Sequence, residues 1–238
     1  MSSATPDSSI LPPCDVLREM YVTGEMPDRS GKRHPVRAEV EAEHAAACYR
    51  VVKERQPELA IEVGMACGSS TLAMLTAMEE NGRGKLISLD PYQDEWFHGV
   101  GTFAVEKAGL AHRHELIQEP SFLALPRLLG EGVRVDLAYQ DGMHEFGFEI
   151  VDLFYLGRML TVGGYLGLND CRLPAVHLAI RYLLSRPDFE ERPVVPTSYR
   201  GRTPLTTLIR FLLRRPVQDR WFEKVEEWEP DFDWWRRF

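Results

Sequence analysis

The residues best suited to chemistry lie in a glycine-containing stretch, residues 60–78. An apolar run at 60–63 contains one acid, Glu62, after which Gly64 and Gly68 frame a tight loop. Hydroxyl residues at 69–71 offer N-caps to an expected helix at 72–78. A strand, a glycine loop and a helix N-terminus let a ligand approach the backbone closely. The stretch is therefore a candidate ligand site, although such a glycine pattern can also serve packing alone.

The spacing of the two glycines argues against a dinucleotide-binding site. Dinucleotide-binding turns carry Gly-x-Gly-x-x-Gly, whereas this loop reads Gly-x-x-x-Gly. A nicotinamide-dependent dehydrogenase is therefore a weak alternative.

Polar side chains recur where other strands are expected to end. Asp90 closes one strand, residues 119–122 follow the next, Asp141 and His144 follow a third, and Asn169 and Asp170 follow a fourth. In a parallel α/β sheet these carboxyl ends meet at one edge, where ligands bind. Asp90 could accept hydrogen bonds from two ribose hydroxyls, or could instead cap a turn.

Asp141, Asn169 and Asp170 carry the oxygen ligands that a hard cation such as Mg²⁺ prefers. Neighbouring strands lie about 4.8 Å apart, so these ligands can converge. His144 could then take a proton from a hydroxyl that the cation has acidified. The alternative is that Asp141 begins an ordinary turn and His144 lies on the surface.

The elements that must position these residues alternate between strand and helix. Strands are expected at 60–63, 85–90, 114–118, 133–140 and 164–168, and helices at 37–53, 72–78, 102–110, 122–129, 146–160 and 174–185. Because a helix connects each strand to the next, the sheet should be parallel and doubly wound. Two further strands, 189–195 and 206–213, have no helix between them and predict an antiparallel hairpin at one edge. The expected fold is α/β, a Rossmann-like seven-stranded sheet that is mostly parallel.

The chain divides into three parts. Residues 36–215 form the expected domain, and residues 1–35 a tail or a lid with a short helix at 16–22. Residues 216–238 form an aromatic, acidic tail, which we expect to dock as a terminal helix through its rings; substrate binding and dimer contact are the alternatives.

Bulk properties narrow the function. The net charge of −8 argues against nucleic acid as a partner, because phosphate binding needs a basic face. The four cysteines form no Cys-x-x-Cys pair, which favours reduced thiols and a cytoplasmic location. We expect no membrane segment, because no apolar run is long enough.

Taken together, these motifs resemble the class I S-adenosylmethionine-dependent methyltransferases. The likeness is greatest to the metal-dependent O-methyltransferase branch, which includes the catechol type, the caffeoyl-CoA type and bacterial natural-product enzymes. It covers about residues 37–213 and is carried by the motifs at 62–70, 86–90, 136–144 and 163–170.

The resemblance implies a role for each matching position. Gly64 and Gly68 would admit the methionine part of the cofactor above Glu62, Ser70 would bind its carboxylate, and Asp90 its ribose. Ser121 would contact adenine, with Phe122, Met143 and Asp141 also at the cofactor, and Asp141, Asn169 and Asp170 would hold the metal. Two positions depart from the catechol type, which has lysine in place of His144 and Asp-Asn in place of Asn169-Asp170.

The resulting expectation is methyl transfer from S-adenosylmethionine to a hydroxyl of a small molecule. Mg²⁺ or another divalent cation would take part, with His144 and Asp141 as the catalytic residues. Metal-independent O- or N-methylation and a non-catalytic scaffold remain alternatives, the acceptor stays open, and the terminal segments could form a homo-oligomer.

Overall fold

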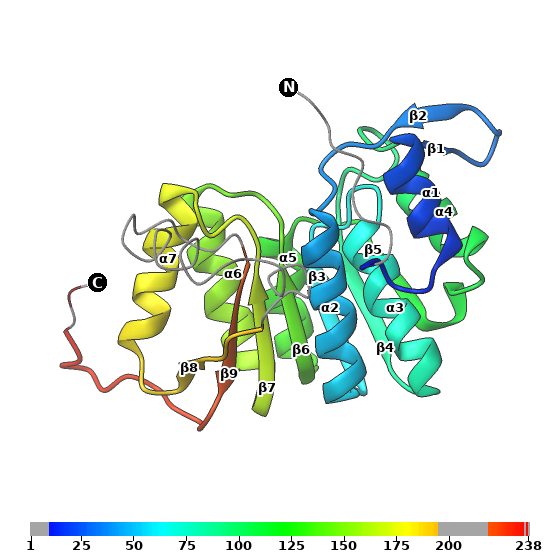
Figure 1. Ribbon diagram of the computed structural model, residues 1–238. Helices are drawn as coiled ribbons and strands as arrows, with labels where there is room; N and C mark the ends of the chain where they lie inside the picture. The colour runs from blue at the N-terminus through cyan, green and yellow to red at the C-terminus, as the bar shows by residue number, and fades with distance from the viewer. Residues whose placement is uncertain (1–9, 195–218, 236, 238) are drawn as a thin grey trace, which may run out of the picture.

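A seven-stranded sheet forms the centre of the protein (Figure 1). The computed structural model describes residues 10–194, 219–235 and 237. The strand order is β5-β4-β3-β6-β7-β9-β8. The parallel strands are β3 (Leu59–Val63), β4 (Lys85–Leu89), β5 (His114–Ile117), β6 (Val135–Gln140) and β7 (Leu160–Leu168). Strand β9 (Arg220–Lys224) is antiparallel to both β7 and β8 (Phe189–Glu191), which confirms the expected fold class.

Helices cover both faces of the sheet (Figure 1). One face carries α2 (Ala42–Arg55), α3 (Ser69–Asn81) and α4 (Val100–Lys107), and the other carries α5 (Ser121–Gly130), α6 (Phe146–Met159) and α7 (Pro174–Ser185). A short 3₁₀ turn, Ala111–Arg113, precedes β5. Successive side chains of a strand point to opposite faces. Leu137 and Tyr139 of β6 accordingly join the core cluster under α2 and α3, and Ala138 joins the cluster under α5, α6 and α7.

The C-terminal tail differs from the expectation. Within the described residues β8 pairs with β9, and the strand expected at 206–213 lies outside the described residues. The sheet therefore continues past residue 215, and the helix expected in the tail is wrong at this point. Both faces of β9 are covered, because Trp221 (2% exposed) joins the core cluster under α2 and α3 and Phe222 (0%) joins the cluster under α5, α6 and α7.

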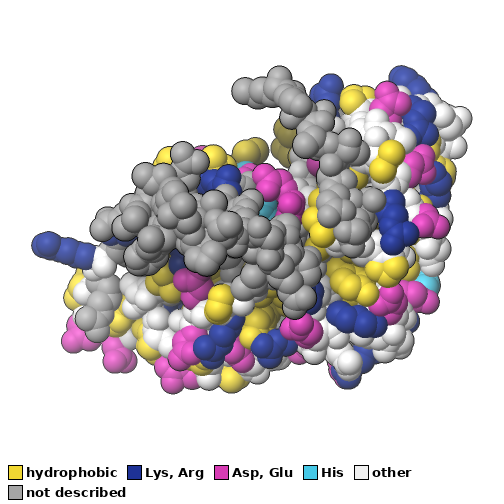
Figure 2. All heavy atoms as spheres, in the orientation of Figure 1, with side chains coloured by type: hydrophobic (Ala, Val, Ile, Leu, Met, Phe, Trp, Pro, Cys, Tyr) yellow, Lys and Arg dark blue, Asp and Glu magenta, His cyan; other side chains and the backbone are white. Residues whose placement is uncertain are grey.

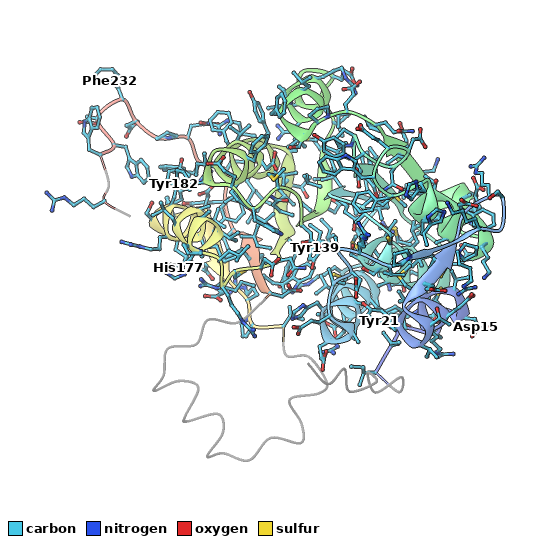
Figure 3. All side chains as sticks on the ribbon, turned by 90° about the horizontal axis from the view of Figure 1, so that it is seen from above. Asp15, Tyr21, Tyr139, His177, Tyr182 and Phe232 are labelled. Atoms are coloured by element: carbon cyan, nitrogen blue, oxygen red, sulfur yellow. The ribbon has the colours of Figure 1, made fainter. Side chains whose placement is uncertain are left out.

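The N-terminal segment is packed against the domain from about residue 10 onward. Helix α1 (Asp15–Thr23) confirms the short helix expected at 16–22, and a hairpin of β1 (Glu25–Pro27) and β2 (Arg33–Pro35), which was not expected, follows it. Leu17 and Met20 join the core cluster on the α3 side. The hydroxyl of Tyr21, labelled in Figure 3, donates to the carbonyl oxygen of Val40, and Lys107 of α4 pairs with Glu19.

All four cysteines are buried and unpaired, as expected for reduced thiols. Within the described parts of the chain, no helix combines the length and apolar character needed to cross a bilayer.

Candidate functional site

Glu62 organises the space beneath the glycine loop. Its side chain is fully buried and accepts hydrogen bonds from the hydroxyls of Ser70, Thr71 (2.6 Å) and Ser88 (2.8 Å). Burial raises the pKa of Glu62 to about 7, and the three hydroxyls oppose that rise. The hydroxyl of Ser70 therefore points to Glu62 and away from any ligand above the loop.

Helix α3 begins earlier than expected, at Ser69, and Gly68 is its N-cap. No side chain caps the helix, so residues 69–71 lie inside the first turn instead of before it. Ser69 accepts a hydrogen bond from the backbone N–H of Val40 at 3.1 Å. The uncapped N–H groups of the first turn can receive an anionic group such as a carboxylate.

The two loop glycines have different roles. Both have a positive φ, 86° at Gly64 and 88° at Gly68. A Cβ at Gly64 would lie 2.2 Å from the carbonyl oxygen of Asp141, whereas the nearest atom to a Cβ at Gly68 belongs to Gly101 at 3.5 Å. Gly64 therefore admits the loop after β6, whereas a Cβ at Gly68 would meet its neighbours at ordinary contact distance.

Asp90 fastens the glycine loop to the end of β4. Its Oδ2 accepts from the N–H groups of Met65 (3.2 Å) and Ala66 (2.8 Å) and from Gln93 Nε2 (3.0 Å). Oδ1 accepts from the N–H of Tyr92 at 2.8 Å. Oδ2 thus has three donors and Oδ1 only one, so Oδ1 is the oxygen that could accept a further hydrogen bond.

The residues expected near adenine lie at the start of α5 and after β6. Ser121 is the first residue of α5, and its side chain lowers the pKa of Asp152 against the effect of burial. Phe122 is 43% exposed and meets Phe148 edge to face, with ring centroids 5.8 Å apart. Met143 is 50% exposed. Phe122 and Met143 thus present apolar surface that a ligand could cover.

Asp141, His144 and Asp170 meet at the carboxyl edge of β6 and β7. His144 Nε2 lies 3.2 Å from Asp170 Oδ2 and 3.6 Å from Asp141 Oδ1. One ligand atom from each residue falls within 4.8 Å of the others. At the upper end of the sheet, acidic side chains lie beside a histidine on the molecular surface (Figure 2).

The charges of this group are strongly coupled. Burial raises the pKa of Asp141 to about 8, and His144 and Asn169 oppose the rise. Burial would lower the pKa of His144, but hydrogen bonds to Asp170 and Glu149 outweigh it and raise the value to about 10. The bond from His144 holds the pKa of Asp170 below its usual value. The imidazole is therefore protonated at neutral pH and balances the carboxylates.

Asn169 lies next to this group, but its oxygen is engaged. The side-chain oxygen accepts the backbone N–H of Asp170, and the side chain lowers the pKa of Asp141 against the effect of burial. The oxygen keeps a second lone pair, so Asn169 stays a candidate ligand beside Asp141 and Asp170.

Three buried acids near the site were missed by sequence reasoning. Glu149 and Asp152 of α6 are each 1% exposed, and Asp219, just before β9, is 8% exposed. His44 Nδ1 lies 3.7 Å from Asp219 Oδ1, and neither atom has a hydrogen-bond partner. The two α6 acids could have been suspected, because they fall at positions of an amphipathic helix where apolar side chains belong.

The site fits both an S-adenosyl group and a divalent cation. Asp141 and Asp170 bring two carboxylates together, which are ligands that divalent metals use, and metal binding would displace the bound protons. The uncapped N-terminus of α3 suits the carboxylate of a ligand, and Oδ1 of Asp90 suits a hydroxyl at the other end of the same ligand.

Known proteins share the central part of this chain. Residues 61–171 match a family model described as "Methyltransferase domain". Caffeoyl-CoA O-methyltransferase 3 of Nicotiana tabacum is 29% identical over 117 residues, which cover 46% of this chain and 44% of that protein. Flavonoid 3',5'-methyltransferase of Vitis vinifera is 27% identical over 159 residues, covering 66% of this chain and 61% of that protein. The matches thus span about half the length of these relatives.

Solved structures share the fold. The O-methyltransferase TomG from Streptomyces achromogenes, in complex with SAM, has a TM-score of 0.60 at 15% identity, covering 79% of this chain and 82% of its own. An O-methyltransferase from Bacillus cereus, in complex with SAH, has a TM-score of 0.55 at 16% identity, covering 65% and 74%.

Proposed function

We propose that this chain, of which residues 61–171 match a methyltransferase domain, is a class I enzyme that transfers the methyl group of S-adenosylmethionine to a hydroxyl of a small molecule with the help of a divalent cation. The observation that carries the proposal is the meeting of Asp141, His144 and Asp170 beside the glycine loop. The names of the curated relatives, caffeoyl-CoA O-methyltransferase and flavonoid 3',5'-methyltransferase, support a hydroxyl on a phenolic ring as the acceptor.

The cofactor would lie along the carboxyl ends of β3, β4 and β5. The first turn of α3, after Gly68, would receive the methionine carboxylate, and Glu62 would keep Ser70 and the loop in place. Asp90 would accept a ribose hydroxyl through Oδ1. Ser121 at the start of α5 would face the adenine.

S-adenosylmethionine already carries an activated methyl group, so the main contribution of the chain is to position the acceptor in line with it. Asp141 and Asp170 would hold the cation; when bound, it would orient a hydroxyl, acidify it and compensate the carboxylate charge around His144. His144 Nε2 faces the same point and would accept the hydroxyl proton.

Calorimetric titration with S-adenosylmethionine and S-adenosylhomocysteine tests the cofactor. We expect saturable binding to the purified chain, and a folded sample that produces no heat at millimolar ligand would refute the proposal. Caffeoyl-CoA and a flavonoid with adjacent ring hydroxyls are the first acceptors to assay. EDTA should abolish transfer and Mg²⁺ or Mn²⁺ should restore it; unchanged activity in EDTA would leave a metal-independent O- or N-methyltransferase.

A non-catalytic role in assembly is the second candidate. His144→Ala and Asp141→Ala separate the two candidates. Each substitution should lower the rate of methyl transfer if the chain is an enzyme that uses these residues, and should change no activity if the chain is a scaffold. Size-exclusion chromatography with light scattering tests whether the chain forms a homo-oligomer.

A further inference from the structure

A buried acid of α6 holds the imidazole of His144. Glu149 is 1% exposed, and its Oε1 lies 3.1 Å from His144 Nδ1. It stands in the first turn of α6, whose N-cap, Glu145, accepts the N–H of Gly147. The acid therefore comes from a rigid element, whereas His144 lies in the loop between β6 and α6.

The Glu149 contact fixes which ring nitrogen faces the site. With Nδ1 engaged by Glu149, Nε2 is directed to Asp170 Oδ2 at 3.2 Å and Asp141 Oδ1 at 3.6 Å. A carboxylate behind a histidine commonly sets ring orientation and tautomer in this way.

Packing alone does not explain an acid at this position. Glu149 Oε2 is buried and has no hydrogen-bond partner. An apolar side chain of similar size would avoid that desolvation cost, because buried charges add little net stability. Glu149 thus has one oxygen bound to His144 and one without a partner, which indicates that its role is to hold the histidine.

We propose that Glu149 is a positioning residue for methyl transfer, which holds the His144 ring by Nδ1 so that Nε2 faces Asp141 and Asp170. The structural part stands by itself, and the catalytic part rests on the proposed function. Asp152, the next buried acid on the same helix face, accepts from Gln140 Nε2 at 3.3 Å, so it supports the end of β6 and not the ring.

The first test reads the ring directly and needs no activity. In ¹⁵N-labelled protein the Nδ1–H proton of His144, assigned by its loss in His144→Ala, should be observable and hydrogen-bonded. Glu149→Ala should remove this signal, Glu149→Gln should retain a shifted signal, and Glu145→Gln, an exposed acid of the same turn, should leave it unchanged. A signal that persists unaltered in Glu149→Ala would overturn the proposal.

The second test is a double-mutant cycle on methyl transfer. Glu149→Ala should lower kcat by about ten- to a hundredfold while leaving the Kd for S-adenosylmethionine within about twofold, and Glu149→Gln should lose less because it keeps an acceptor oxygen. In the His144→Ala background Glu149→Ala should cause no further loss. Additive losses, or an equal fall in cofactor affinity, would show a merely structural role. If the wild type transfers no methyl group, the proposed function fails, and the nuclear magnetic resonance result still decides whether Glu149 holds the ring.

Discussion

Replacing Glu62 by glutamine should change how the stability of the domain depends on pH. Glu62 is 0% exposed, and burial raises its pKa from 4.5 to about 7 even though Ser70, Thr71 and Ser88 donate hydrogen bonds to it. The folded protein therefore keeps a proton on this carboxyl at pH values where the unfolded chain has released it. Glutamine has a similar shape and does not titrate.

The sign and the size follow from proton linkage. Because the folded pKa is raised, the contribution of Glu62 to stability is fully present below pH 4.5 and is lost as pH rises through about 7. A shift from 4.5 to about 7 corresponds to roughly 3 kcal/mol. The free energy of unfolding of Glu62→Gln, relative to wild type, should therefore increase by roughly that amount between pH 4.5 and pH 8.

Urea unfolding followed by circular dichroism at several pH values in this range measures the difference. Subtracting the wild type cancels the titration of other groups that both proteins share. Glu79→Gln, in the neighbouring helix α3, is the control, because Glu79 is exposed and Arg113 holds its pKa below the usual value, so its difference should stay flat above pH 5. A flat difference for Glu62→Gln as well would refute the reasoning from burial.

Three further predictions concern the loop and the cation site. Gly64→Ala should destabilise the domain by more than Gly68→Ala in urea unfolding, because both lose a positive φ at a cost of about 1–2 kcal/mol but only Gly64 also meets backbone at 2.2 Å; equal losses would contradict this. Asp90→Ala should weaken S-adenosylmethionine binding in calorimetry by at least about tenfold, since it loses a ribose acceptor and an anchor of the loop. Asp141→Asn and Asp170→Asn should each weaken Mn²⁺ binding, followed by electron paramagnetic resonance, by at least about tenfold; unchanged binding would place the cation elsewhere.

Periodicity predicted the parallel half of the fold well, because the strands there are short, mostly apolar runs and each is followed by a helical segment. Helix α7 has the expected bounds, Pro174–Ser185. The exception is β9, whose aromatic residues lie among acids, so that the sequence pattern predicted a terminal tail at this point. What makes it a strand is its place between β7 and β8, a tertiary fact that local pattern does not contain.

The sequence predicted those residues of the candidate site that follow directly after a strand. Asp141, His144 and Asp170 converge as expected, because parallel strands bring their carboxyl ends to one edge. Hydrogen-bond direction was not predictable. The Ser70 hydroxyl points down to Glu62, and the Asn169 oxygen turns to its own backbone, and neither choice follows from sequence spacing.

The Gly64 contact gives the site a property that neither motif has alone. The N–H of Asp141 donates to the carbonyl of Val63 at 2.9 Å, and the carbonyl of Asp141 occupies the space that a side chain at position 64 would need. The loop proposed to seat the cofactor and the acid proposed to hold the cation are thus joined by direct backbone contact. Methyl transfer requires donor and acceptor to be in line, and a displacement of about 1 Å can cost a hundredfold in rate. The absence of a side chain at Gly64 would therefore set the distance between the two halves of the proposed reaction, which is a stricter requirement than room for a ligand.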